Sequence, residues 1–421
     1  MKAIVVSVRG LQAGALGCYG NVWIDTPAFD ALAAEGIVFD WHYADRATTE
    51  GACRAWRTGR CHLPMLSSPA ATVLEPDLIA ALRSRSIHTC LIVDENRTYP
   101  DCFLAGWDAV VRASAGEHDS PLDAVLEAVG AALERLEHRD NWLLWIDLPT
   151  LLSPWNVPSA FRDPYFPEET DREDEEENEP LTPFTDVPNG LIDRDDDTLY
   201  LGLQTSYAAA VSYVDAALGQ LLEALTGLEG GDEVLLFATS DVGQNLGEHG
   251  LVGNSRPWLH DELIHVPMLL RLPGATEAGR RVEALTQAVD LAPTLADWFG
   301  LDLSGAHGHS LLPLARGEVE TVRPYACVGL QIGAALEYAL RTPQWSFLWP
   351  AHPHGEDEGR SPRLYAKPDD RWEVNDLAQH HLEWVEQLER ALGDFVTATA
   401  QPGPLRLPLL PEPDSTNAVA E

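Results

Sequence analysis

Short apolar runs rich in β-branched residues alternate along this chain with longer stretches of helical periodicity. The runs expected to form buried strands are Ala3–Val8, Ile37–Trp41, His88–Val93, Trp142–Ile146, Val234–Ala238 and Met268–Leu272. Between them, apolar residues recur every three to four positions, as in Pro121–Glu137, Tyr200–Leu228 and Leu291–Trp298. Strands that alternate with helices are typical of a mostly parallel sheet covered on both faces. The sequence therefore predicts an α/β fold with a mostly parallel sheet sandwiched by helices.

Changes in composition divide the chain into three parts. Residues 1–318 carry the alternating pattern and are interrupted at 163–197 by an acidic insertion with EDEEENE at its centre. Residues 319–400 hold short strand-like pieces and then a helical stretch, which predicts a small C-terminal α+β subdomain. Residues 401–421 are rich in proline and are expected to form a loose tail. The insertion is expected to be a solvated, dispensable surface loop, with a docking patch for a basic partner as the alternative.

The charge of the chain is strongly one-sided. It contains 66 acidic and 28 basic residues, for a formal net charge of -38. Such a field repels nucleic acid and anionic membranes, so neither is expected as a partner. No apolar run approaches the roughly 20 residues that a membrane span needs, and no secretory signal precedes the first strand. The six cysteines lack CxxC spacing and are expected to be reduced thiols, which favours a cytoplasmic location.

A series of short motifs follows one order along most of the chain. They are LQAGALGCYGN (11–21), TPAFDALAAEGIVFDWHYA (26–44), TGR (58–60), TSDVGQNLGEHGL (239–251), HDELIHVPMLLRLPG (260–274), VDLAPTLADWFGL (289–301), HGHSLLPLARGE (307–318) and LYAKPDDRWEVNDLA (364–378). The ordered set resembles the sulfatase family of the alkaline-phosphatase-like superfamily. This resemblance implies a divalent cation, usually calcium, held by carboxylates at the carboxyl ends of strands. It also implies a cysteine or serine converted to formylglycine, with lysines, an arginine and histidines around the ester.

The positions that should bind the cation have mostly lost their oxygen ligands. Alignment on GCYG puts Arg9 and Gly10 where the family has two adjacent aspartates. The later metal pair is Asp241 followed by Val242, where the family has aspartate and then asparagine or histidine. A guanidinium, a glycine and a valine offer no side-chain oxygen to a hard cation. One carboxylate cannot hold calcium, so the family calcium site is expected to be lost, with no cofactor in its place.

The nucleophile segment is equally altered. Counting back from TGR puts Thr49 at the nucleophile position and Cys53 at the position of the family's arginine, with Arg54 one residue late. Threonine is not a substrate for formylglycine formation. A local shift could bring Arg54 into the pocket, and Cys53 as a displaced nucleophile is disfavoured because no base is placed for it.

The family's remaining charged groups are also replaced. A lysine and a histidine expected after the strand at 88–93 become Asp94 and Asn96. A further lysine, expected after GEHGL, is absent. Since Lys2 and Lys367 are the only lysines in the chain, no other alignment register restores either one.

These losses favour a catalytically inactive pseudo-sulfatase with a binding or regulatory role toward an unknown protein or small-molecule ligand. One alternative is an ester hydrolase that uses Thr49 and two zinc ions, although the expected Asp and His clusters are missing. Another is a sulfuric or phosphoric ester hydrolase with a rearranged site that uses Arg54 and either His249 or His260. The histidines at 249, 260 and 265 are interpreted as structural.

The vacated cation position also predicts a contact. Asp241 without a metal would be a buried carboxylate without a counter-charge, which costs free energy. Arg9 brings a fixed charge and a planar fork of donors to the position of a lost ligand. We therefore predict an Arg9–Asp241 salt bridge. The alternative is that Arg9 faces solvent while Asp241 caps a helix that begins near Gly243.

Overall fold

An eight-stranded sheet forms the centre of the computed structural model, which describes residues 1–66, 75–114, 120–166, 181–193, 196–253, 258–355, 359–401 and 405–410. In spatial order its strands are β11 (Arg280–Gln287), β2 (Ile37–Tyr43), β10 (Met268–Arg271), β7 (Val234–Thr239), β1 (Lys2–Val8), β5 (Trp142–Leu148), β3 (His88–Asp94) and β4 (Ala109–Ala113). β10 runs antiparallel to β2 and β7, and the other pairs are parallel. The carboxyl ends of β1, β3, β5 and β7 therefore meet at one edge.

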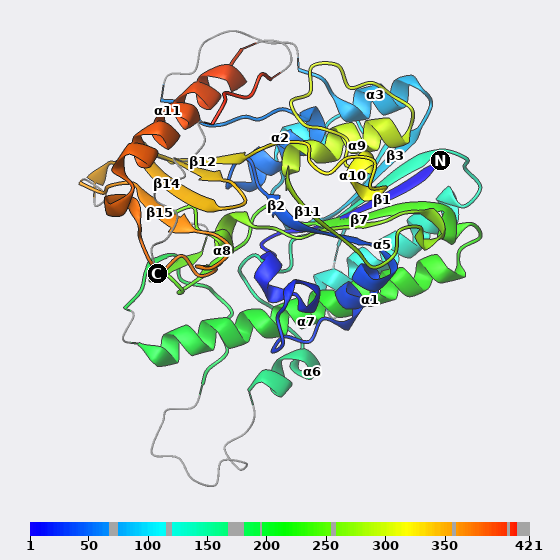
Figure 1. The fold of residues 1–421 in the computed structure, drawn as a ribbon. Coiled ribbons are helices and arrows are strands. Elements are labelled where there is room, and N and C mark those ends of the chain that lie inside the picture. The colour runs from blue at the N-terminus through cyan, green and yellow to red at the C-terminus, as the bar shows by residue number, and fades with distance from the viewer. Residues whose placement is uncertain are drawn as a thin grey trace.

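Helices cover both faces of this sheet (Figure 1). One layer contains α1 (Pro27–Glu35), α5 (Pro121–Leu136) and α7 (Asp197–Gly227), and the other contains α2 (Thr49–Thr58), α3 (Leu78–Ser84), α9 (Leu291–Trp298) and α10 (Leu312–Ala315). Because side chains alternate along a strand, β1 contributes to both layers. Ala3 and Val5 belong to one hydrophobic cluster, and Ile4 and Val6 to the other. The predicted α/β sandwich is confirmed.

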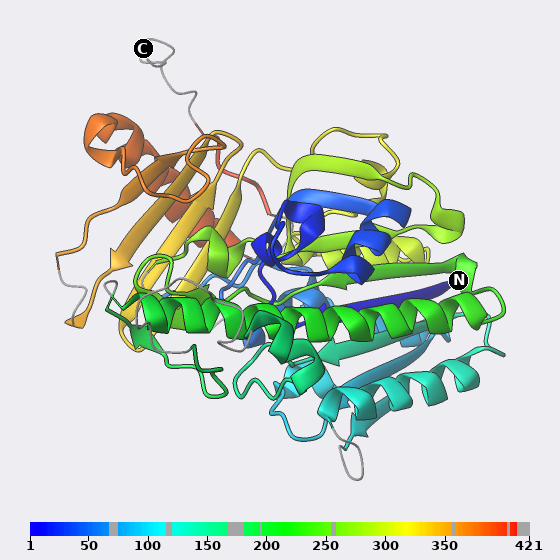
Figure 2. The ribbon, with the colours of Figure 1, turned by 90° about the horizontal axis from the view of Figure 1, so that it is seen from below.

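A second, antiparallel sheet follows in the chain and lies beside the first (Figure 2). Its strands are β12 (Ala326–Ile332), β13 (Ala335–Arg341), β14 (Trp345–His352) and β15 (Arg363–Ala366), and α11 (Leu382–Thr399) packs on it. Leu336, Tyr338 and Phe347 share one hydrophobic cluster with residues of the main sheet. Two backbone hydrogen bonds of Gly329, with Asp45 and Ala47, also join the two sheets. The C-terminal unit therefore has no separate core.

Residues 405–410 are held more firmly than their proline content predicts. Leu405 and Leu407 pack against the cluster shared by the two sheets. The Tyr325 hydroxyl donates a hydrogen bond to the Pro408 carbonyl at 2.7 Å. The expectation of a loose tail is therefore wrong for residues 405–410, and residues 411–421 lie outside the described part.

The acidic insertion is only partly described, since residues 167–180 and 194–195 lie outside it. Its described part contacts the body of the protein. β6 (Gly190–Leu191) pairs with β9 (Leu251–Gly253), which also pairs with β8 (Asn245–Leu246). Phe184 lies so close to Gly202 of α7 that a Cβ there would stand 2.8 Å from its ring. Residues 181–193 thus contact the body of the protein while remaining exposed or half-buried, and the expectation that the insertion is dispensable stays a prediction.

The remaining described α-helices are three short ones: α4 (Asp101–Leu104), α6 (Ser159–Arg162) and α8 (Asp261–Ile264). α8 lies just before β10, on the side of the main sheet that faces the antiparallel sheet (Figure 1). None of the helices in the described ranges is long and apolar enough to cross a membrane.

Candidate active site at the sheet edge

Side chains from four elements converge at the carboxyl edge of the central strands. Arg9 follows β1, Asp147 lies near the end of β5, Asp241 follows β7, and Thr49 and Cys53 lie in the first turns of α2. α2 can begin here because the Thr48 hydroxyl accepts a hydrogen bond from the Gly51 N–H, which caps the helix. This is where the sequence places the degenerate metal and nucleophile positions.

Arg9 forms a buried ion pair with Asp147. Its Nε donates to Asp147 Oδ2 at 2.6 Å, and both side chains are almost inaccessible, with exposures of 3% and 0%. The guanidinium stands over the Tyr99 ring, 4.6 Å from its centre, in cation–π geometry. The Ser7 hydroxyl donates to the other Asp147 oxygen at 2.7 Å. Burial raises the pKa of Asp147, and the adjacent Arg9 charge opposes that rise.

The predicted Arg9–Asp241 salt bridge is therefore wrong in its acceptor. Asp241 is fully buried, but neutral donors satisfy its carboxylate. One oxygen accepts from the N–H groups of Gly10 at 3.1 Å and Val242 at 2.7 Å, and the other accepts from the Thr49 hydroxyl at 2.5 Å. Gly10 can present its N–H because it adopts φ of +84°, a left-handed conformation that favours glycine.

The alternative prediction for Asp241 and Arg9 is wrong as well. Residues 240–253 are all described and contain no helix, so Asp241 caps none near Gly243. Arg9 does not turn to solvent either, since only 2% of the residue is exposed. Asp241 instead forms a tight turn by accepting from its own neighbour, Val242. Val242 is fully buried and packs in a hydrophobic cluster with Leu263 and Ile264.

Cys53 lies beneath the ion pair. Its Sγ is 3.8 Å from Arg9 Nη2, and the residue is fully buried. Burial raises the pKa of the Cys53 thiol well above its ordinary value, and the Arg9 charge only partly opposes this. Since the thiolate is the nucleophilic form, this environment disfavours Cys53 as a displaced nucleophile.

Three other residues singled out in the sequence lie apart from this group. Arg54 pairs with Glu75 at 2.5 Å and is 42% exposed, so it does not turn toward Arg9 and Asp147. Asp94 Oδ1 accepts from the backbone and side-chain amides of Asn96 at 2.9 and 3.3 Å, a local turn at the end of β3. The hypothesis that a shifted Arg54 fills the pocket is therefore wrong.

The residues at the family's calcium position do not fit a hard cation. Calcium binds six to eight oxygen ligands. Arg9, Gly10 and Val242 supply no side-chain oxygen, and both oxygens of Asp241 already accept hydrogen bonds. The permanently charged Arg9 guanidinium would also repel an ion at this edge.

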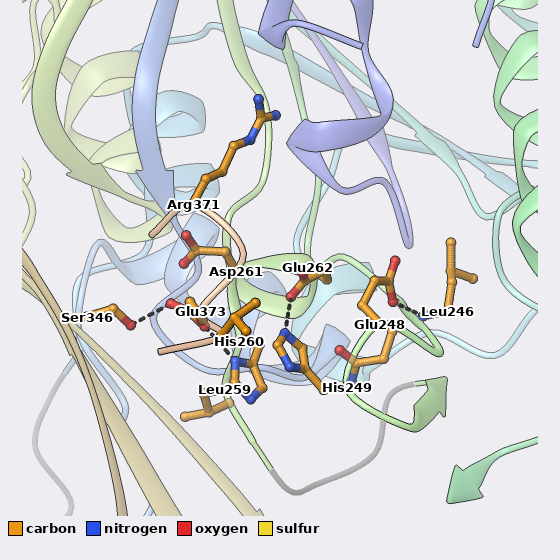
Figure 3. A network of polar contacts seen from close by, with 12 residues as sticks. Leu246, Glu248, His249, Leu259, His260, Asp261, Glu262, Ser346, Arg371 and Glu373 are labelled. Carbon is orange, nitrogen blue, oxygen red and sulfur yellow. Dashed lines mark hydrogen bonds and ion pairs between the residues drawn. The ribbon is translucent and has the colours of Figure 1, made fainter. Parts of the chain in front are cut away.

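A second polar group surrounds α8 (Figure 3). The sequence did not indicate that its side chains would come together. The rings of His249 and His260 stack with centroids 3.6 Å apart and planes 8° apart. His249 Nε2 lies 3.6 Å from Glu262 Oε2, and His260 Nδ1 lies 2.5 Å from Glu373 Oε2. His265, by contrast, contacts the Asp40 carbonyl at 2.8 Å through Nε2 and packs on Trp41 and Tyr43. His249 and His260 thus face carboxylates, whereas His265 contacts a carbonyl and aromatic rings, and the interpretation of all three as structural stays a prediction.

Comparison with known proteins points to one family. The family model described as sulfatase matches residues 153–301. An N-acetylglucosamine-6-O-sulfatase of Bacteroides thetaiotaomicron is 34% identical over 123 residues, which are 29% of this chain and 22% of that protein. Human iduronate 2-sulfatase is 23% identical over 387 residues, covering 72% of this chain and 70% of that protein.

The fold has a close counterpart among solved structures. The crystal structure of the phosphonate monoester hydrolase of Agrobacterium radiobacter superimposes with a TM-score of 0.72. The two share 19% sequence identity, and the superposition covers 95% of this chain and 96% of the hydrolase chain. At this identity the likeness concerns the fold.

Proposed function

Since the chain belongs to the sulfatase family of the alkaline-phosphatase-like superfamily, we propose that it is a catalytically inactive member with a binding or regulatory role. The observation that carries this proposal is the buried Arg9–Asp147 pair. It puts a fixed positive charge at a position where the family places a metal-binding aspartate. Loss of the metal removes both the Lewis acid and the means of activating a nucleophile.

The ligand of such a protein is proposed to be a protein or a small molecule. The net charge of -38 argues against nucleic acid and anionic membranes, because both would be repelled. All six cysteines are free thiols, which supports a reducing compartment such as the cytoplasm.

One observation favours a second candidate function, an ester hydrolase with a rearranged site. The Thr49 hydroxyl donates to Asp241 Oδ2 at 2.5 Å, the relation of a nucleophile to its general base. Against it, Arg9, whose charge acts on Asp241, is already engaged by Asp147. An attacking Thr49 would lack a free positive charge to stabilise the transition state.

Turnover assays separate the two functions. We expect aryl sulfates, aryl phosphates and phosphonate monoesters to react no faster with the protein than in buffer. The Thr49→Ala variant should give the same result, because Thr49 has neither formylglycine chemistry nor a metal to support it. Turnover that disappears in Thr49→Ala would instead establish the second candidate.

Calcium should leave the stability of the protein unchanged. A ligand that binds only the folded state raises the melting temperature, and the rise grows with the ratio of ligand concentration to Kd. Millimolar calcium should therefore not shift the thermal midpoint of the wild type, because Arg9 and the donors around Asp241 exclude the ion. A calcium-dependent rise that is lost in Asp241→Asn would contradict the proposal.

A further inference from the structure

Three side chains around α8 bring metal-binding atoms together. His249 lies between β8 and β9, His260 precedes α8, and Glu262 lies within it. One ring nitrogen of each histidine and one carboxylate oxygen of Glu262 all lie within 4.8 Å of one another. His260 is completely buried, and only 14% of the His249 side chain and 8% of the Glu262 side chain are exposed. The group is therefore an interior site.

Each of these residues has a buried polar atom without a hydrogen-bond partner in the described part of the chain. The atoms are His249 Nε2, His260 Nε2 and Glu262 Oε2. The 3.6 Å between His249 Nε2 and Glu262 Oε2 is too long for a hydrogen bond. Buried polar atoms are nearly always hydrogen-bonded. Three that are not lie together here, two of them only at ion-pair distance from each other, and this points to a missing common partner.

The surroundings of His260 are those of a metal ligand. Its Nδ1 is 2.5 Å from Glu373 Oε2, so this nitrogen carries the proton and Nε2 keeps its lone pair (Figure 3). Ser346 donates to the other Glu373 oxygen at 2.5 Å, and Arg341 and Lys367 lie 3.2 and 3.3 Å from it. These cations keep Glu373 ionised and fixed in place. A carboxylate that orients a ligating histidine through its other nitrogen is the usual support of a protein metal site.

We infer that His249, His260 and Glu262 bind a divalent transition-metal ion of the zinc type. Two imidazoles and one carboxylate suit zinc, which takes nitrogen and oxygen ligands in tetrahedral geometry, and they are too few and too soft for calcium. Two ligand atoms at about 2.1 Å from one zinc ion lie about 3.4 Å apart, close to the 3.6 Å between His249 and Glu262. The fourth position is left for water or another ligand.

Binding requires a small movement of the His249 ring. The two stacked rings are nearly parallel, whereas one ion needs their lone pairs to converge. Rotation of the His249 ring about its Cβ–Cγ bond achieves this and breaks the stack, while Glu373 keeps the His260 ring in place. Glu262 also lines a cavity of about 520 Å³, which provides open space beside one of the three ligands.

Titration of metal-free protein with Zn²⁺ in the presence of a chromophoric chelator tests the inference. We expect one tightly bound ion per chain in the wild type and in the surface control His138→Gln. His249→Gln and Glu262→Gln should each abolish stoichiometric binding. Glu373→Gln, which removes the orienting carboxylate together with its ion pairs to Arg341 and Lys367, should weaken binding about 10–100-fold. Circular dichroism of each variant establishes that it is folded.

The visible absorption of bound Co²⁺ reports the coordination geometry of the site. Co²⁺ in a four-coordinate nitrogen and oxygen site should show visible absorption bands that His249→Gln removes and His138→Gln keeps. Absence of stoichiometric zinc binding in the wild type would mean that His249 and Glu262 form an ion pair only, and would overturn the inference. Equal binding by the wild type and His249→Gln would overturn it as well.

Discussion

Replacing Arg9 with alanine should lower the free energy of unfolding by about 3–5 kcal/mol, the cost of leaving one member of a buried ion pair unpaired. Asp147 is fully buried and would keep only the Ser7 hydroxyl as a side-chain donor. The substitution also removes the guanidinium from the Tyr99 ring and leaves a cavity among the strand ends. Urea unfolding monitored by tryptophan fluorescence measures the change.

Arg54→Ala is a matched control. It separates the effect on stability of breaking a buried ion pair from the effect of removing any arginine. Arg54 also pairs with a carboxylate at 2.5 Å, but its side chain is 42% exposed. Exposed pairs contribute about 0–1 kcal/mol, so Arg54→Ala should have a small effect. A double variant, Arg9→Met with Asp147→Asn, should be more stable than Arg9→Ala because it leaves no unpaired buried charge. If Arg9→Ala is no less stable than Arg54→Ala, the pair does not stabilise the fold.

Acid should destabilise the protein well before its exposed carboxylates titrate. His42 in β2 is fully buried, and its Nδ1 contacts the Thr286 hydroxyl at 2.9 Å. Burial, with a smaller effect of Arg323, lowers the pKa of His42 from 6.5 to about 3. Because the folded-state pKa is the lower one, stability is complete above pH 6.5 and falls as the pH drops toward 3. The loss from His42 alone should reach about 2 kcal/mol at pH 5 and about 4 kcal/mol near pH 3.

Substitution of His42 separates its contribution to the loss of stability in acid from the contributions of other histidines. His42→Asn cannot take up this proton, so its stability should fall less steeply than that of the wild type between pH 7 and pH 5. Burial also lowers the pKa of His62 to about 3, so part of the acid sensitivity should remain in the variant. The exposed control His138→Gln should keep the wild-type slope. A slope in His42→Asn equal to that of the wild type would show that His42 is not the group responsible.

The layered fold could be predicted because its central strands are long apolar runs that only a doubly covered sheet can bury. The elements that the sequence did not predict, such as β11 and α2, lack a long apolar run. β11 lies at the edge of the sheet, where exposed Arg281 and Glu283 alternate with buried Val282 and Ala284. α2 has the sequence TEGACRAWRT, whose threonines and glycine disfavour a helix, and its cap and its contacts with α4 and α9 compensate.

At the candidate site, the sequence indicated which groups were lost but not how the remaining ones would pair. Asp147 directly follows the apolar run Trp142–Ile146, which predicts a strand but does not indicate which group pairs with the buried carboxylate. Asp241 needs no cation because the Gly10 and Val242 N–H groups and the Thr49 hydroxyl satisfy it. The sequence does not indicate which backbone N–H groups will donate to a side chain, since the direction of each N–H depends on φ and ψ. His249 and His260 meet only because a short hairpin and the start of α8 bring them together.

The central position of β1 has a consequence for how the chain is made. Lys2 lies opposite Trp142 on one side and Val234 on the other, so β1, which is synthesised before β5 and β7, is fully paired only after β7 has emerged from the ribosome. Until then its apolar side chains and unpaired backbone groups are exposed to other chains. Pairings this distant must overcome loop-closure entropy before they stabilise anything, so folding should be slow. During synthesis β1 is therefore a segment at which unfinished chains can associate with one another.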